Sequence, residues 1–596
     1  MSKRRRTQAR SAAAPDPAPA VPLLARAWTG ALLVFAAALA VRLLFWQATP
    51  GTGWPHSAFF KGDAVVWLRY ALALERGQVF ELGLPLRPPA TAYLMALVWD
   101  GRLQTIEGLR IAWAVLGALV PALMFLILRR AFSPLVAWLA AAGAAASTAL
   151  ILLSTSLNNE TPSLVLTLLT LLLFDRLRER PQPALLAAWS ALHGLACLFR
   201  VEHVLFFAGS LALLAWAWMR AGRAAAGVLS HAALSLAVAA AVLVPWHVHA
   251  WREVRRLNTV PADEPQARAM EQRFASVAWD EAARAQAQRV PAFVRGTVST
   301  FVAATVVHRG ASRVRPQDVT LVLEEAFGYE PRPIAGHPFV AGYGPLNFAL
   351  ANGPSLSGGF DRARLNAPPP LAGGADRFPA AFVQGLPPQD LALAYPPHLR
   401  LYNEGYSIGW SWIRSAPGAA LALAARKLVI FWQGAALGFT GYDLPLGLSG
   451  LRRAVDLVVP EGAGATAWRL LILAGSVAGL AAGWRRAALQ GWLLFLLTKV
   501  AATVLFFGYA RQGAMVAPVV LVLLALAAER WLFRGRLAGL AGAPFKAGLA
   551  VLAAALLIEA ARQQAHPQVL IDGEVVTSAA DPVPLDVHRD NHVLVR

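Results

Sequence analysis

The chain has 596 residues, of which 57% are hydrophobic and 15% charged, and its mean hydropathy is +0.49. Ordinary soluble domains have about 25% charged and 45–50% apolar residues, so the composition argues against a disordered chain, a coiled coil or a soluble enzyme. The formal charge of +20 lies in short basic clusters between apolar runs, a pattern that orients membrane helices. We therefore predict a multi-pass protein of the lipid bilayer without a nucleic-acid partner.

Eleven apolar runs approach the ~20 residues that a helix needs to cross a bilayer. They are 28–46, 109–128, 135–153, 161–177, 184–199, 204–219, 225–246, 467–484, 488–507, 514–528 and 537–558. The basic tail 1–27 is predicted to be disordered and cytoplasmic, and the other basic clusters then fall on the same side of the membrane. The fold class predicted is an all-α membrane protein with about 11 transmembrane helices.

These runs divide the chain into domains. Residues 28–246 would form a bundle of about seven helices, with an outer loop at 47–108 that carries amphipathic helices. Residues 467–560 would form the C-terminal membrane helices, and the polar tail 561–596 would follow outside, with a strand-like stretch at 568–576.

The segment 247–466 is too long for a simple connection, so we expect an external soluble domain of mixed structure. It would contain a helix at 263–289, a loop rich in Pro and Gly at 331–375, and a final interfacial helix at 417–433.

The first candidate for chemistry is Asp63, which follows the first apolar run and precedes an amphipathic helical pattern in the outer loop. Hydrophobic residues from Val65 to Leu74 form one face of this helix, and Arg69 and Glu75 mark the other. Asp63 either caps this helix through its side chain or supplies a carboxylate at the membrane surface.

Three more candidates fall in turns that the predicted topology places on the same outer side. Glu160 lies at the start of a predicted span, where it either complements the helix dipole or faces a wet cavity. Arg200 lies beside Glu202 and His203, as an internal ion pair, an anion site or, less simply, part of a metal site. Arg511 has no topological role outside the membrane, and its guanidinium matches the geometry of a phosphate.

Four loose motifs in chain order resemble the GT-C superfamily of membrane glycosyltransferases, and within it the bacterial family 39 group, which is related to protein O-mannosyltransferases and lipid A aminoarabinose transferases. The residues that carry the resemblance are Gly62-Asp63 with Tyr70, Gly77, Pro85 and Pro88-Pro89; Gly194-Leu195-Ala196 with Arg200; Asn347-Phe348, Asn352-Gly353-Pro354 and Gly358-Gly359-Phe360 with Pro417 and Lys427; and Ala510-Arg511 with Pro518.

The resemblance implies transfer of a sugar from a polyprenyl-phosphate donor to a hydroxyl group, with inversion, on the outer face of a bacterial inner membrane. It implies that Asp63 is the general base and that Arg511 and Arg200 stabilise the departing phosphate. Glu160 would orient the acceptor or bind a divalent metal ion, which some relatives use. Tyr70, His203 and Lys427 are further candidates for substrate binding.

Two departures from the family pattern bear on substrates. Asp63 stands between Gly62 and Ala64 rather than beside a second acidic residue, so the acceptor can be a glycan, a lipid or a protein. Gln512 replaces the second arginine of the last motif.

Two other functions stay open at this stage. A transporter or flippase of lipid-linked sugars would use the same arginines but need no base, and a membrane scaffold would need neither.

Overall fold

The computed structural model describes only part of the chain. The described residues are 27–48, 63–78, 80, 86–155, 157–259, 275–326, 328–337, 340–354, 356–359, 393, 396–437, 463–533, 570–571 and 574–575. The last predicted span, 537–558, and most of both terminal tails lie outside them.

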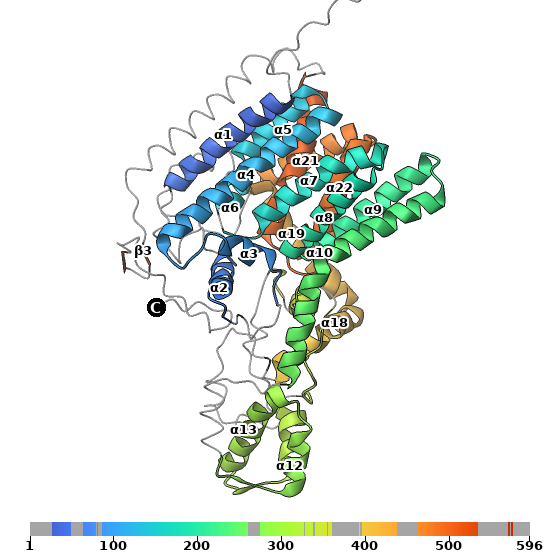
Figure 1. The fold of residues 1–596 in the computed structure, drawn as a ribbon. Coiled ribbons are helices and arrows are strands. Elements are labelled where there is room, and N and C mark those ends of the chain that lie inside the picture. Colours follow the sequence, from blue (N-terminus) through green and yellow to red (C-terminus); the bar gives the residue numbers. More distant parts are fainter. Residues whose placement is uncertain are drawn as a thin grey trace, which may run out of the picture.

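A bundle of apolar helices forms the body of the molecule (Figure 1). Its helices are α1 (Ala27–Ala48), α4 (Leu103–Ala131), α5 (Pro134–Ala146), α6 (Thr148–Thr155), α7 (Glu160–Glu179), α8 (Pro183–Phe199), α9 (His203–Arg220), α10 (Ala225–Thr259), α19 (Pro417–Leu437), α21 (Ala463–Gly483), α22 (Gln490–Leu505), α23 (Ala510–Met515) and α24 (Ala517–Ala528), with the short turns η6 (Ala487–Leu489) and η7 (Glu529–Phe533). The main hydrophobic core lies between α4, α5, α7, α22 and α24.

The predicted all-helical membrane fold is confirmed, but the number of eleven spans is not. Among the described residues, six helices are long and apolar enough to cross a membrane: Ala27–Leu44, Thr105–Ala131, His203–Arg220, Ala225–Thr259, Pro417–Ala436 and Ala487–Leu505. The predicted run 135–153 is split at Ser147, whose backbone is extended, and the run 514–528 is split at Val516. The interfacial placement of 417–433 remains a prediction, since the length and composition of this helix also allow it to cross.

A buried arginine ties α1 to the last turn of α6. Arg42 Nε donates to Ser154 Oγ at 2.9 Å, and its Nη1 lies 3.1 Å from the carbonyl oxygen of Ala38. Gly117 in α4 makes room for this pair, because a Cβ there would clash with Ser154. These contacts fix α6, which leads directly into the turn before α7.

A smaller layer lies beneath the bundle (Figure 1). It consists of α2 (Ala64–Glu75) and α3 (Ala90–Ala96), which share a core with the start of α4. Trp99 Nε1 donates to the carbonyl of Leu68 at 3.0 Å, and Trp113 Nε1 donates to the carbonyl of Asn158 at 2.9 Å. The helix after Asp63 is therefore confirmed, but the prediction that Arg69 lies on its exposed face is wrong, because Arg69 is buried.

A second region, predicted to be external, is built on the C-terminal end of α10 (Figure 1). Its elements are β1 (Ala278–Trp279), α12 (Glu281–Gln288), α13 (Ala292–His308), β2 (Arg313–Val314), α14 (Pro316–Thr320), η4 (Leu321–Ala326), α15 (Gly344–Ala351) and α18 (Pro396–Ser415). Strands β1 and β2 pair in parallel, with Ala278 opposite Arg313.

Three predictions for the external segments can be compared with these elements. The continuous helix predicted at 263–289 is wrong, because residues 278–279 form a strand and only Glu281–Gln288 is helical within the described part. The loop predicted at 331–375 contains the helix α15. The strand-like stretch 568–576 is confirmed as the antiparallel pair β3 (Leu570–Ile571) and β4 (Glu574–Val575).

Candidate functional site

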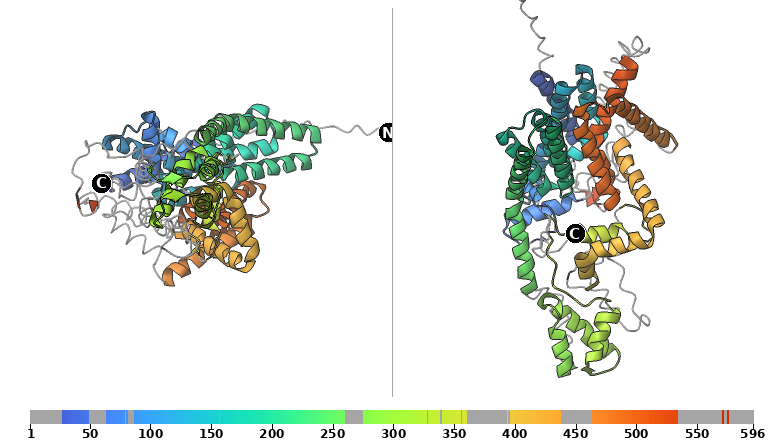
Figure 2. Two further views of the ribbon diagram at one scale, coloured as in Figure 1. Left: turned by 90° about the horizontal axis from the view of Figure 1, so that it is seen from below. Right: turned by 90° about the vertical axis from the view of Figure 1, so that its right-hand side faces the viewer.

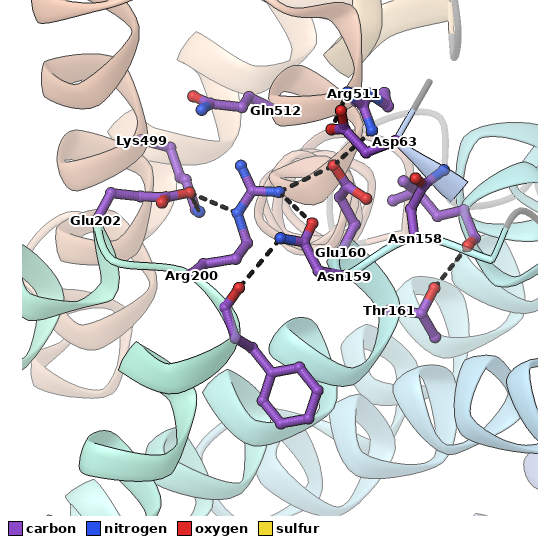
Figure 3. A network of polar contacts seen from close by, with 12 residues as sticks. Asp63, Asn158, Asn159, Glu160, Thr161, Arg200, Glu202, Lys499, Arg511 and Gln512 are labelled. Carbon is purple, nitrogen blue, oxygen red and sulfur yellow. Dashed lines mark hydrogen bonds and ion pairs between the residues drawn. The ribbon is translucent and has the colours of Figure 1, made fainter. Parts of the chain in front are cut away.

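Six ionised side chains of alternating sign form a continuous chain of ion pairs at the base of the bundle (Figure 3). In order they are Asp63, Arg511, Glu160, Arg200, Glu202 and Lys499. They come from the start of α2, from α23, from the start of α7, from the turn between α8 and α9, and from α22. Segments that are up to 448 positions apart in the sequence meet in this network.

Asp63 is the accessible end of the network. Its Oδ2 accepts a hydrogen bond from Arg511 Nη2 at 3.0 Å, and its side chain is 40% exposed, whereas that of Arg511 is 9% exposed. Asp63 stands at the N-cap position of α2, but its side chain makes no capping hydrogen bond there. The side-chain cap considered from the sequence is therefore wrong, and the carboxylate faces the network instead.

Glu160 joins two arginines in the middle of the network. Its Oε1 lies 2.9 Å from Arg200 Nη1 and 3.4 Å from Arg511 Nη1, and its side chain is 2% exposed. Arg200 Nη1 also donates to Asn159 Oδ1 at 2.9 Å. Such burial of a carboxylate is tolerated because two guanidinium groups pair with it. Glu160 thus holds two guanidinium groups in place.

Glu202 and Lys499 form the buried end and were not singled out as site residues from the sequence. Lys499 Nζ donates to Glu202 Oε1 at 3.0 Å, and Arg200 Nε donates to the same oxygen. Burial alone would raise the pKa of Glu202, but the charges of Arg200 and Lys499 outweigh it and hold that pKa well below its ordinary value. For Arg200, burial lowers the pKa and the charges of Glu202 and Glu160 outweigh it, so the net shift is upward.

Arg87 is a second cation on Asp63 that the sequence analysis missed. Its Nη1 lies 3.6 Å from Asp63 Oδ1, and its guanidinium lies 5.1 Å from the ring centroid of Tyr343 and 5.8 Å from that of Trp67. The two aromatic faces hold the arginine in position. The only signal for it in the sequence was its place before Pro88-Pro89 in the outer loop.

The carboxylates of the network do not fit a divalent metal ion in this arrangement. Asp63 is paired with Arg511 and Arg87, and Glu160 with Arg511 and Arg200, so a metal ion would be the third cation at either carboxylate. Within the described residues, no three His, Cys, Asp or Glu side chains group as metal ligands. We therefore derive no catalytic step through a metal ion.

The structure does not bring the other three predicted binding residues into this network. Tyr70 stacks on Phe80, with ring centroids 4.7 Å apart. His203 is buried between α8 and α9, with its Nε2 2.9 Å from Nδ1 of His193. Lys427 is also buried, and its Nζ donates to Asn352 Oδ1 and to the carbonyl of Val504, both at 3.0 Å. Substrate binding by these residues remains a prediction.

The contacts of Lys427 lead to a first test. The Lys427→Met variant should lose about 1–3 kcal/mol of stability, because two buried acceptors lose their donor. Its KM for a sugar donor should stay unchanged, since the Lys427 ammonium group is bound to Asn352 and to the carbonyl of Val504 rather than to Asp63 or Glu160. Thermal unfolding and initial rates measure the two quantities. A large rise in KM without loss of stability would instead restore Lys427 as a binding residue.

Part of this site lies in a segment that matches a known family model. Residues 86–249 match the family model described as dolichyl-phosphate-mannose-protein mannosyltransferase. The matched segment is a little over a quarter of the chain and contains Arg87, Glu160, Arg200, Glu202 and His203. The match confirms, for this segment, the resemblance stated from the sequence. Together with the apolar helices, it supports a multi-pass membrane glycosyltransferase of the GT-C type.

Solved structures with a similar course of the chain come from Archaeoglobus fulgidus. The oligosaccharyltransferase AglB in complex with an inhibitory peptide and a dolichol-phosphate has 15% identity and a TM-score of 0.39, over 90% of this chain and 56% of that chain. The oligosaccharyltransferase complex with zinc and sulfate has 15% identity and a TM-score of 0.36, over 89% and 53%. This chain thus spans little more than half the length of those structures. No curated protein matches the sequence.

Proposed function

We propose that this protein transfers a sugar from a polyprenyl-phosphate donor to a hydroxyl group of an acceptor at the outer face of a bacterial inner membrane. The acceptor is a glycan, a lipid or a protein. The cytoplasmic N-terminus predicted from the basic clusters places the Asp63 network on the outer side. The family match of residues 86–249 supports the transferase class.

One observation carries the proposal. A partly exposed carboxylate, Asp63, lies 3.0 Å from a nearly buried guanidinium, Arg511, with a second guanidinium, Arg87, on its other oxygen. Transfer of a phosphate-linked sugar needs a base for the acceptor hydroxyl and cations for the leaving phosphate. Here both kinds of group meet at the accessible end of an otherwise buried network.

In the proposed reaction, the acceptor oxygen attacks the anomeric carbon of the donor sugar while Asp63 takes the hydroxyl proton. The new bond is the glycosidic C–O bond, and the bond that breaks joins the anomeric carbon to the phosphate oxygen. The electron pair of that bond leaves with the polyprenyl phosphate, whose added negative charge Arg511 and Arg87 stabilise. A single displacement of this kind inverts the anomeric configuration.

The remaining network residues act through Arg511. Glu160 lies 3.4 Å from Arg511 Nη1 and is itself held by Arg200. Arg200 was expected to bind phosphate, but its donors contact Glu202, Asn159 and Glu160. We therefore propose that Arg200 and Glu160 are positioning residues and that Arg87 takes the binding role.

Arg87 provides the next test. The Arg87→Gln variant should raise the KM for the lipid-linked donor about 10- to 100-fold, because a hydrogen bond to a charged group contributes about 1.5–3 kcal/mol. The turnover number should change less. Arg102→Gln, in the same outer loop and with a side chain 68% exposed, is the matched control. An equal rise in KM in both variants would mean that only the charge of the loop matters.

A direct assay distinguishes the proposed transferase from the two alternatives, a flippase of lipid-linked sugars and a membrane scaffold. The purified protein in lipid is given a radiolabelled polyprenyl-phosphate hexose and an envelope extract. Label that appears in the extract polymer or lipid fraction supports a transferase. Label that only crosses the bilayer on its lipid would indicate a flippase. If a protein that binds the donor neither transfers the label nor moves it across the bilayer, a scaffold is favoured.

A further inference from the structure

Helix α18 lies across the end of the bundle, just before the chain enters it (Figure 2). The helix ends at Ser415, and α19 begins at Pro417 and packs along α22 and α23. Pro417–Ala436 is long and apolar enough to cross a membrane, and we infer that the bend between the two helices lies at the edge of the membrane. The last turns of α18 therefore lie at the level of the lipid headgroups.

The exposed surface of α18 is divided into two lines. Tyr406, Trp410 and Ile413 are spaced four and three residues apart, so they lie on one side of the helix. Tyr406 and Trp410 are 37% and 43% exposed. The second line, about 100° further round the helix, is polar and exposed. It consists of Arg400, Ser407, Ser411 and Arg414.

The opposite face of α18 packs closely against α15. A Cβ at Gly405 would clash with the carbonyl of Pro345, and a Cβ at Gly409 would clash with the ring of Phe348. Phe348 also packs against the rings of Tyr406 and Trp410, with centroids 5.4 Å and 5.5 Å away. Tyr406 also packs with its hydroxyl against Gly344, and both aromatic rings keep more than a third of their surface exposed.

We propose that α18 is an interfacial helix whose Tyr406–Trp410–Ile413 line lies in the headgroup region of the outer leaflet, with the Arg400–Ser407–Ser411 line facing water. Tyr and Trp favour this position because one end of each ring system is apolar and the other forms hydrogen bonds. Arg414 at the last turn can reach lipid phosphates. This inference relocates the interfacial helix from 417–433 to the helix that precedes it, and it does not depend on the proposed reaction.

The proposed contact would also fix the height of the candidate site. Helix α18 packs closely against α15 at Gly405 and Gly409. Tyr343, which precedes α15, contacts Arg87. Arg87 in turn pairs with Asp63. A bilayer that holds α18 at the surface would therefore hold Asp63 close to the level at which a lipid phosphate lies.

Spin labels can test this placement, because the sequence has one cysteine, Cys197, which is buried. In a Cys197→Ala background, single substitutions Tyr406→Cys, Trp410→Cys, Ser407→Cys and Ser411→Cys are labelled with a nitroxide in nanodiscs. Power saturation then gives the ratio of accessibility to oxygen over accessibility to a water-soluble nickel complex. Leu421→Cys on the exposed face of α19 serves as the lipid reference and Arg284→Cys on α12 as the water reference.

The proposal predicts a split within one helix. The labels at Tyr406 and Trp410 should give ratios between the two references, and the labels at Ser407 and Ser411 should match the water reference. Ratios at all four positions equal to that of Arg284→Cys would overturn the proposal, as would ratios at all four equal to that of Leu421→Cys. The two aromatic positions are independent, and Ile413→Cys replaces either one if that variant does not fold.

Discussion

The Asp63→Asn variant is expected to transfer sugar about 10²–10⁴-fold more slowly than the wild type, because this is the usual contribution of a positioned general base. Asparagine has nearly the same size and still accepts a hydrogen bond from Arg511, but it cannot take the hydroxyl proton. Substrate binding should persist, since the guanidinium groups of Arg511 and Arg87 remain. Transfer rates at saturating donor measure the effect.

Asp100→Asn is the matched control for this variant. Asp100 lies in the same outer loop, its side chain is 39% exposed and lies 3.6 Å from Arg102, so its exposure and pairing resemble those of Asp63. Its hydrogen bonds within the described residues join it to the start of α4, through the backbone of Arg102 and the side chain of Thr105. We expect wild-type transfer from it. Equal rates in the two variants would remove Asp63 from the mechanism.

The second large effect is expected on stability. The Glu160→Leu variant should lose about 3–5 kcal/mol, because Arg200 and Arg511 would remain in a buried site without the carboxylate between them. Glu160→Gln should cost less, since its amide oxygen can still accept one hydrogen bond. Thermal unfolding in the same detergent gives both values, with the exposed Glu324→Leu as the control. Full stability of Glu160→Leu would show that the network does not hold these elements together.

The membrane-protein class, most helix positions and four of the six network residues could be predicted from the sequence. Apolar runs and basic clusters suffice for the first two, because bilayer thickness and charge bias act on local sequence. Asp63, Glu160, Arg200 and Arg511 were found because each is an ionised residue close to an apolar run on the predicted outer side.

Residues that act through distant partners were harder to predict. Lys499 lies inside a predicted span, and only its meeting with Glu202, 297 positions away, gives it a partner. Arg87 looked like an ordinary loop charge, because the aromatic rings of Trp67 and Tyr343 that contact it come from other segments. Helix α15 formed within a Pro- and Gly-rich stretch because α18 offers it a notched surface at Gly405 and Gly409.

The central claim is that Asp63 and Arg511 divide base and phosphate binding between them at one site. The most direct test measures donor binding and transfer separately in Asp63→Asn and Arg511→Gln, with folding checked by thermal unfolding. We predict that Asp63→Asn binds the radiolabelled donor at least as tightly as the wild type, because its carboxylate no longer competes for the two arginines, yet fails to transfer. Arg511→Gln should lose donor binding. Wild-type transfer by Asp63→Asn, or unchanged donor binding by Arg511→Gln, would contradict the claim.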